Sequence, residues 1–349
     1  MGRLTFMIGN GFDLACGLNS RFEDTYDGYV HTASSSKAIK KFKGIIDANL
    51  GNWSDFEMAL AKYAQCFQDE AELVECVCDY TEYLTKHLIK EQEDFVSKHM
   101  DNSFLAEILS NEMQRSLSLE NFYGGLTRNS EIAIQSALRL DEKPLLTSRR
   151  YVSFNYTDVF DRILDMLPPI EPAPVFNSSK PQKPSVLHIH GKLSKGGVIL
   201  GLDNEVQISG LPYNLSDNGK MCLVKPTMTD NSDHERKSKT LRIIKESDVI
   251  CIYGLSLGES DLTWKNAIAE WLRADATHQL VYYEFTLSQK ANTTLHSYVL
   301  KMTENKAKYD LAQKLFGDNL PNAIVESQIH IPVGYNIFNF KKAIENGYA

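Results

Sequence analysis

The sequence predicts an α/β protein whose mostly parallel sheet carries a helical insertion. Short apolar, β-favouring runs recur along the chain, and most of them end at a glycine or a polar turn. Helix-favouring stretches separate these runs, as expected where helices connect parallel strands. Residues 52–123 differ from the rest, because they contain no glycine and no proline and are rich in Ala, Leu, Glu and Lys. That stretch predicts helices without a strand.

Length and composition agree with this fold class. The chain has 349 residues, of which 43% are hydrophobic and 23% charged, so wholesale disorder and collagen-like architecture are excluded. The net charge of -8 argues against sequence-independent binding to nucleic acid. Residues 52–123 alone hold fifteen acidic and five basic residues. The remainder is near neutral and can accept an anionic small molecule.

The beginning of the chain and its cysteines predict a cytoplasmic protein. A glycine and an asparagine follow residues 1–8 and interrupt the apolar run before it reaches the length of a signal-peptide core, so we expect no signal peptide. No uncharged apolar stretch approaches the roughly 18 residues that span a bilayer. The six cysteines include no CxxC pair, so we expect neither a disulfide framework nor a metal site.

The first strand is predicted at residues 4–8, and a glycine turn and a helix follow it. Two glycines after a strand let the backbone approach a pyrophosphate, whose charge the N–H groups of the next helix attract. The alternative is a tight turn without a ligand, since Leu14 stands where the nucleotide-binding fingerprint has its third glycine. The candidate nucleotide-binding residues of this turn are Gly9, Asn10, Gly11 and Asp13.

The helical insertion is predicted at residues 52–145, which divides the sheet domain into residues 1–51 and 146–349. Its helices carry an apolar stripe at helical spacing, formed by Leu73, Val77, Tyr80 and Leu84. We expect part of this stripe to pack on the sheet domain. We expect the insertion also to contribute to a subunit contact of a homo-oligomer, most simply a dimer, or to a lid over the binding pocket.

A second strand is predicted at residues 150–154, and Asn155 follows it. An asparagine at the end of such a strand can orient a water molecule or bond to a ribose. Alternatively, Asn155 caps a helix that begins at Thr157. A proline-rich surface loop is expected at residues 168–184.

The next strand is predicted at residues 186–190, with His188 and His190 on one face. Two histidines on one face can serve acid–base chemistry or bind a metal ion. His190 stands next to Gly191, which permits close approach of a ligand, so His190 is the functional candidate and His188 its support.

The last predicted elements include another strand that ends in glycine and polar residues. Residues 197–201 predict a short strand and residues 203–240 a long loop with some local structure. The clearest buried strand is predicted at residues 248–253. Small residues that suit nucleotide binding follow it. A helix at residues 261–274 and a strand at residues 279–285 come next. Ser260 or Asp261 can instead cap that helix. The candidate binding residues after this strand are Gly254, Ser256 and Asp261.

In their order along the chain, these motifs resemble the bacteriophage abortive-infection AbiH family. The resemblance covers most of the chain, from residue 4 to about 285. It implies an antiphage function and allows a phage trigger or a partner protein of a defence system. The matching stretches are residues 8–18, 53–57, 154–157, 188–191, 201–204 and 253–261.

The same skeleton is similar to the wider Sir2-like group of Rossmann-like, NAD-binding proteins. The resemblance implies that the glycine turn holds the pyrophosphate of NAD, that Asn155 positions a water molecule or the ribose, and that His190 acts on a ribose hydroxyl. Gly254 and Ser256 would then lie near the adenosine half. The chain lacks the zinc module with two CxxC pairs that deacetylases of this group carry. This departure favours NAD hydrolysis over deacylation.

The sequence therefore predicts a Rossmann-like, Sir2-like α/β domain with an acidic helical insertion. We expect an abortive-infection effector that hydrolyses NAD at the nicotinamide–ribose bond, with Asn155 holding the attacking water and His190 taking a proton or polarising a ribose hydroxyl. Two other functions remain open at this point. One is a nucleotide-binding sensor without turnover, and the other is a metal-dependent hydrolase built around His188 and His190.

Overall fold

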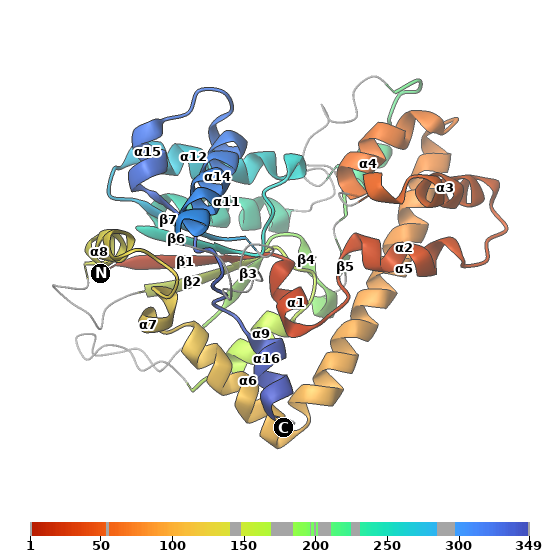
Figure 1. Ribbon diagram of the computed structural model, residues 1–349. Coiled ribbons are helices and arrows are strands. Elements are labelled where there is room, and N and C mark those ends of the chain that lie inside the picture. The colour runs from red at the N-terminus through yellow and green to blue at the C-terminus, as the bar shows by residue number, and fades with distance from the viewer. Residues whose placement is uncertain are drawn as a thin grey trace.

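A parallel six-stranded sheet organises the protein (Figure 1). The structure is a computed structural model, and it describes residues 2–53, 56–139, 148–168, 184–195, 197–198, 200–201, 211–224, 231–284 and 297–347. The strands stand in the order β3-β2-β1-β6-β7-β8, and all neighbours are parallel. Their bounds are β1 Arg3–Ile8, β2 Ser148–Ser153, β3 Val186–His188, β6 Val249–Tyr253, β7 Gln279–Tyr283 and β8 Ile329–His330. A separate antiparallel ladder joins β4 Gly191–Lys192 to β5 Gly197–Val198.

This strand order is that of a Rossmann-like sheet and confirms the predicted fold class. From β1 the chain moves outward through β2 to β3, then returns to β6 beside β1 and moves outward in the other direction. The order therefore reverses between β1 and β6. At such a switch point the connections after the two strands leave toward opposite sides and open a crevice at their carboxyl ends.

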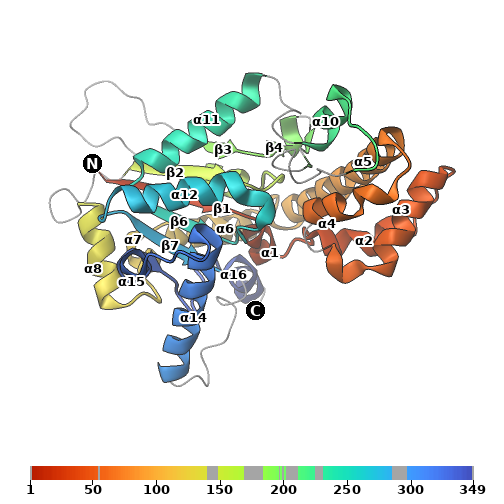
Figure 2. The ribbon, with the colours of Figure 1, turned by 90° about the horizontal axis from the view of Figure 1, so that it is seen from above.

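Both faces of the sheet are covered, because alternate side chains of its central strands enter different cores. In β1, Phe6 and Ile8 enter one core and Met7 enters the other. One face packs against α1 Gly11–Cys16, α6 Ser103–Ser116, α7 Leu119–Phe122, α8 Arg128–Ala137, α9 Val159–Asp165 and α16 Phe340–Gly347. The other face packs against α11 Asn231–Glu246, α12 Leu262–Ala274, α14 Ser297–Phe316 and α15 Asn322–Ser327 (Figure 2).

Besides the two cores on the faces of the sheet, a separate hydrophobic core lies beside the sheet, among the helices at the right of Figure 1; it is called the second core below, in contrast to the cores of the sheet. It is rich in aromatic side chains, such as Tyr26, Phe42, Trp53 and Tyr80. Its helices are α2 Phe22–Val30, α3 Lys37–Ala48, α4 Phe56–Tyr63, the first part of α5 Glu70–Phe95, and α10 Asp217–Leu223. Short helical turns complete the structure at η1 Leu50–Asn52, η2 Ala64–Cys66, η3 Val96–Met100, η4 Leu193–Lys195 and η6 Glu259–Asp261.

Helix α5 connects the second core with the core under the sheet, which is the one that contains Phe6 and Ile8. Asp69 caps its beginning by accepting a hydrogen bond from the amide of Glu72 at 3.0 Å. Its 26 residues give it a length of roughly 39 Å. Leu73 lies in the second core, whereas Phe95 at the other end lies in the core under the sheet. Helices α6, α7 and α8 also pack under the sheet, and the domain division at residues 52 and 145 stays a prediction.

The apolar stripe of the insertion is buried, but not in a subunit contact. All four of its side chains lie in the second core with at most 2% of their surface exposed: Leu73, Val77, Tyr80 and Leu84. These residues are therefore covered within one chain. They cannot form the expected contact between subunits, and the homo-oligomer stays a prediction that needs another surface.

Two sequence expectations on local structure are wrong. The loop expected at residues 203–240 ends in a helix, since α11 begins at Asn231. The chain has no glycine or proline from Asn231 to Tyr253, which favours a helix there. The polar composition of residues 203–240 had led to the prediction of a loop. The strand expected at residues 186–190 ends at His188. Beyond residue 285, a region for which no element was predicted either way, the structure has α14, α15, the edge strand β8 and α16.

Some predicted features lie outside the described residues. These are most of the proline-rich loop, at residues 169–183, and parts of two motifs, at residues 54–55 and 202–204. Within the described part of the chain, we find no helix that is both long and apolar enough to span a bilayer.

The turns after β1 and β6 touch backbone to backbone. The amide of Gly11 donates to the carbonyl oxygen of Gly254 at 2.9 Å. A Cβ atom on Gly11 would lie 2.4 Å from the Cα atom of Gly254, and one on Gly9 would lie 2.6 Å from its carbonyl oxygen. Both glycines are thus required for the contact between the two turns, whether or not a ligand approaches them.

We predict that Gly11→Ala lowers the free energy of unfolding by about 1–3 kcal/mol, because the added methyl group overlaps the backbone of the facing turn. The matched control is Gly44→Ala, since Gly44 lies inside α3 with no atom within 4 Å of an added Cβ. That change should raise stability by about 0.5–1 kcal/mol. Urea unfolding measures both values, and a Gly11→Ala variant as stable as the wild type would contradict the close contact.

Candidate functional site

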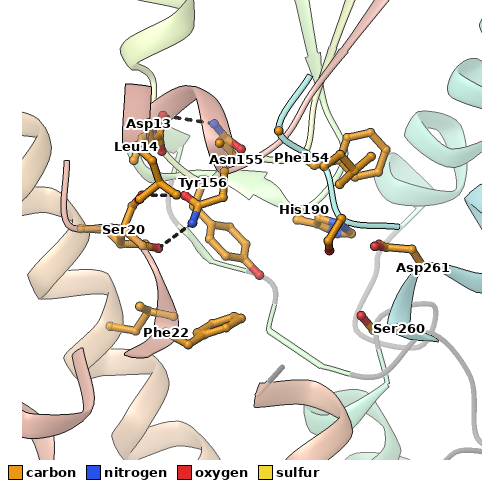
Figure 3. A pocket seen from close by; sticks show the side chains of 18 of the residues that line it. Asp13, Leu14, Ser20, Phe22, Phe154, Asn155, Tyr156, His190, Ser260 and Asp261 are labelled. Carbon is orange, nitrogen blue, oxygen red and sulfur yellow. Dashed lines mark hydrogen bonds between the residues drawn. The ribbon is translucent and has the colours of Figure 1, made fainter. Parts of the chain in front are cut away.

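A cavity of about 350 Å³ lies at the carboxyl ends of β1, β2 and β6, between the sheet and the second core (Figure 3). This position, beside the β1–β6 switch point, is where open α/β sheets bind ligands. Its volume falls at the small end of the range of about 300–1,000 Å³ for small-molecule pockets. The lining residues are Asn10, Gly11, Asp13, Leu14, Ser20, Phe22, Glu57, Leu84, Leu88, Phe154, Asn155, Tyr156, Thr157, His190, Gly254, Leu255, Ser256, Ser260 and Asp261.

The structure brings the candidate residues from four separate segments into this one cavity, with a single exception. Gly9 is not among the lining residues, and its amide donates to the carbonyl oxygen of Tyr253 at 2.9 Å. The candidates that line the cavity are Asn10, Gly11, Asp13, Asn155, His190, Gly254, Ser256 and Asp261.

Asp13 holds the segment after β2 in place. Its side chain is 1% exposed and accepts a hydrogen bond from Nδ2 of Asn155 at 3.1 Å and another from Oγ1 of Thr157 at 2.7 Å. Figure 3 shows the contact between Asp13 and Asn155. Burial raises the pKa of Asp13 to about 7, although the hydrogen bonds from Thr157 and Asn155 and the charge of His188 lower it.

Asn155 is oriented by its neighbours and does not cap a helix. Helix α9 begins at Val159, and the side-chain amide of Asn155 donates to Asp13 instead. Asn155 is 4% exposed, and its Oδ1 atom is buried without a hydrogen-bond partner among the residues that the structure describes. Because an unsatisfied buried acceptor costs about 1–3 kcal/mol, this oxygen requires a donor such as a water molecule or a ligand hydroxyl.

His188 is not a lining residue, but it contacts the backbone of Asn155. Its Nδ1 atom lies 3.0 Å from the carbonyl oxygen of Asn155, and its Nε2 atom lies 2.8 Å from a carboxylate oxygen of Asp161. Both partners only accept, so both hydrogen bonds require a ring with two N–H groups. Burial raises the pKa of Asp161, but His188 and Lys192 outweigh this effect and leave it below its ordinary value.

His190 diverges from His188, contrary to the expectation that the two rings share a face. Because β3 ends at His188, the strand rule does not extend to His190. The ring of His190 lies 5.7 Å from that of Phe154 and 6.3 Å from that of Tyr156, in the cavity wall. Both nitrogens of His188 are already hydrogen-bonded, so the two histidines do not form a metal-binding pair. The described residues include no cluster of three or more metal-ligating side chains.

The glycine turn uses most of its amides within the protein. Besides those of Gly9 and Gly11, the amides of Phe12 and Leu14 donate to carbonyl oxygens of the same turn. The side chain of Asn10 is also engaged, since Ser20 Oγ donates to its Oδ1 at 2.6 Å and its Nδ2 donates to the carbonyl oxygen of Ser20. These four amides therefore do not remain for a pyrophosphate.

The turn after β6 forms the opposite wall. Gly254 has a φ of 66°, a conformation that favours glycine. The carboxylate of Asp261 accepts a hydrogen bond from the amide of Gly258 at 3.1 Å and so closes the turn before α12. From outside, Nζ of Lys314 in α14 donates to the carbonyl oxygen of Ser256 at 2.9 Å.

Sequence reasoning overlooked Glu57 and Tyr156 as members of this site. Glu57 comes from α4, is 5% exposed, and accepts from the amide of Gly201 at 3.4 Å. Burial raises the pKa of Tyr156 well above its ordinary value, and the charges of Glu57 and Asp261 add to this effect. The sequence shows an acidic residue next to the aromatic Phe56. Only the structure shows that Phe56 is buried and that Glu57 lines the cavity.

The described lining residues are acidic. They include the carboxyl groups of Asp13, Glu57 and Asp261, and no Lys or Arg. Acidic groups favour a ligand whose buried part is neutral or positively charged.

Comparison with known families gives one match. The family model described as bacteriophage abortive infection AbiH matches residues 5–283 of this chain. The matched range runs from β1 to the end of β7 and includes every residue that lines the cavity. The comparison with curated proteins gives no match.

We predict that Asp13→Asn removes a pH dependence of stability. The pKa of Asp13 is about 7 in the folded protein, against an ordinary value of 3.8, so the folded state binds the proton more tightly. Relative to the variant, the wild type should be most stable below about pH 4 and should lose stability as the pH rises to about 7. Each pKa unit corresponds to about 1.4 kcal/mol, so the change should amount to a few kcal/mol.

Urea unfolding of both proteins between about pH 4 and pH 8 measures this difference. The control variant is Asp47→Asn, which removes an exposed carboxylate on α3. If the curves of wild type and Asp13→Asn stay parallel over the whole range, the buried carboxyl group does not titrate as described.

Proposed function

This chain belongs to the bacteriophage abortive infection AbiH family, and on that premise we propose that it hydrolyses NAD at the bond between nicotinamide and ribose. The family gives the chain a role in phage abortive infection. NAD loss would stop the metabolism of an infected cell, and a phage component or a partner protein would trigger it. The Sir2-like resemblance of the motifs supports the choice of NAD.

The buried amide oxygen of Asn155 carries this proposal. It lies in the wall of a cavity at the switch point of the sheet, and no donor in the described part of the chain bonds to it. The carboxylate of Asp13 fixes the amide so that its nitrogen faces Asp13. The oxygen is then left to accept a hydrogen bond from the water molecule that attacks the ribose, or from a ribose hydroxyl.

The cavity suits the nicotinamide–ribose end of NAD better than its pyrophosphate. About 350 Å³ is a small volume for a dinucleotide but accommodates a nucleoside-sized group. The nicotinamide ring of NAD is positively charged, and the acidic lining favours it. Because four amides of the glycine turn bind within the protein, we do not assign the pyrophosphate to them.

The chemistry follows from this placement. The C1′–N bond breaks, its electron pair neutralises the nicotinamide nitrogen, and the ribose becomes positively charged. The water molecule held by Asn155 attacks C1′, and His190 accepts the proton that this water loses. The products are nicotinamide, ADP-ribose and one proton. Acid–base assistance of this kind contributes about 10²–10⁴-fold to a rate.

We predict that Asn155→Ala and His190→Ala each lower the rate of nicotinamide release from NAD by about 100-fold or more, because each removes a group that handles the attacking water. The matched control is His31→Ala, since His31 is an exposed histidine outside the cavity. Chromatography of nicotinamide and ADP-ribose measures turnover, and circular dichroism verifies folding. A chelator should leave the rate unchanged.

Other outcomes separate the remaining functions. If NAD binds in this cavity and no nicotinamide is released, the protein is a nucleotide sensor. If a chelator removes a stoichiometric metal ion together with the activity, the protein is a metal-dependent hydrolase. If either variant keeps the wild-type rate, the role proposed for that residue is wrong.

A further inference from the structure

We propose that Asp161 is a positioning residue, whose single carboxylate holds both segments that present Asn155 and His190 to the cavity. Asp161 lies in α9 and is not among the lining residues, so it acts through other side chains. These are His188, which contacts the segment after β2, and Lys192, which belongs to the segment after β3. The inference rests on the function proposed above and adds a residue to it.

The first argument is the path from Asp161 to Asn155. Oδ2 of Asp161 lies 2.8 Å from Nε2 of His188, and Nδ1 of the same ring lies 3.0 Å from the carbonyl oxygen of Asn155. Asp161 is ionised at neutral pH, since its pKa lies below the ordinary value although burial raises it. Neither partner can donate, so His188 donates in both directions as a charged ring. Such charge-assisted hydrogen bonds are short and strong, and this one fixes the main chain at Asn155.

The second argument is the path from Asp161 to His190. The other carboxylate oxygen, Oδ1, accepts a hydrogen bond from Nζ of Lys192 at 2.8 Å. Lys192 stands in β4, two residues after His190. The amide of Leu193 also donates to the carbonyl oxygen of Tyr156 at 2.9 Å, which joins this segment to the one after β2. With its second oxygen Asp161 therefore holds the segment that places His190 in the cavity wall.

The third argument is that these polar contacts are not what attaches α9 to the protein. Four apolar side chains of this helix lie in the core under the sheet with at most 1% of their surface exposed: Val159, Phe160, Ile163 and Leu164. Burial of charged groups costs free energy that an ion pair recovers only in part, so the pairs of Asp161 add little to this attachment. Their main effect is one of direction, because they join a firmly packed helix to the two segments that carry the proposed catalytic groups.

The charges around Asp161 are balanced. Lys192 Nζ lies 2.8 Å from Asp161 and 3.8 Å from Oδ1 of Asp158, so two carboxylates face the two cations Lys192 and His188. Asparagine at position 161 would leave two cations beside one carboxylate. Its amide also has a single acceptor oxygen for two donors. At least one of the two paths is then broken, and the segment at its end can shift.

Kinetics with NAD test the role in positioning. Asp161→Asn should lower kcat for nicotinamide release by roughly 10–100-fold with little change in KM, because displacement of reacting groups by about 1 Å has an effect of this size. Asp161→Glu keeps both oxygens and the charge, so it should recover part of the lost rate. It also serves if the asparagine variant does not fold.

The matched control is Asp248→Asn. Both oxygens of Asp248 accept hydrogen bonds from the side chain of Arg3, but this pair lies at the amino ends of β1 and β6, at the opposite edge of the sheet from the cavity. The variant loses an ion pair of the same kind and should keep the kcat of the wild type. Loss of rate in both variants to the same extent would show that a general loss of stability causes it, and would overturn the proposal.

Nuclear magnetic resonance tests the hydrogen bonds without NAD. Long-range proton–nitrogen spectra of the protein labelled with ¹⁵N-histidine show whether a ring carries one or two N–H groups, and His188→Gln identifies the signals of His188. At neutral pH the ring should carry two N–H groups in the wild type and in Asp248→Asn. It should carry one in Asp161→Asn, because the acceptor that stabilises the charged ring is removed.

The two measurements separate this inference from the function on which it rests. A single N–H group on His188 in the wild type, two in Asp161→Asn, or a wild-type kcat in Asp161→Asn overturns the role of Asp161. If His188 behaves as expected but the wild type releases no nicotinamide, the hold of Asp161 on the cavity wall is supported and NAD hydrolysis is contradicted.

Discussion

The buried carboxyl group of Asp13 is the constraint on which the geometry of the cavity depends. It belongs to the helix after β1, and it accepts hydrogen bonds from Asn155 and Thr157 in the segment after β2. Because ionisation of a buried carboxyl group is unfavourable, the two donors are needed to stabilise it. In return they fix the amide of Asn155, while His188 holds the carbonyl oxygen of the same residue. One buried charge thereby determines which atom of Asn155 a ligand can meet.

Two further features form the cavity beside Asp13 and Asn155. The glycines of the β1 turn allow it to touch the turn after β6, so the switch point is closed at its base. Helix α5 extends from the core that contains Phe6 into the second core, and its Leu84 and Leu88 line the cavity. Helices α4 and α5 thereby supply the wall that faces the sheet, and with it Glu57. The sheet and these two helices together line one cavity, which neither would form alone.

The sequence predicted the features that local signals encode. Strand ends followed by glycine or polar residues marked Asn10, Asn155, His190 and Gly254, and parallel strands bring such ends to one edge. It did not predict what depends on packing between distant segments. The need for glycine in the β1 turn arises from the facing turn, and the place of Glu57 in the cavity wall arises from the packing of α4 near η6. The divergence of the two histidines followed from the early end of β3, which no local pattern marks.

The most direct test of the central claim is a crystal structure of the protein with an NAD analogue in which a methylene group replaces the ribose ring oxygen, since this analogue cannot form the charged ribose. The account predicts that the nicotinamide–ribose end enters the cavity, with a ribose hydroxyl or an ordered water molecule within hydrogen-bond distance of Asn155 Oδ1 and the nicotinamide ring against the acidic lining. A pyrophosphate lying across the turn at residues 9–11, with the nicotinamide ring outside the cavity, would contradict it.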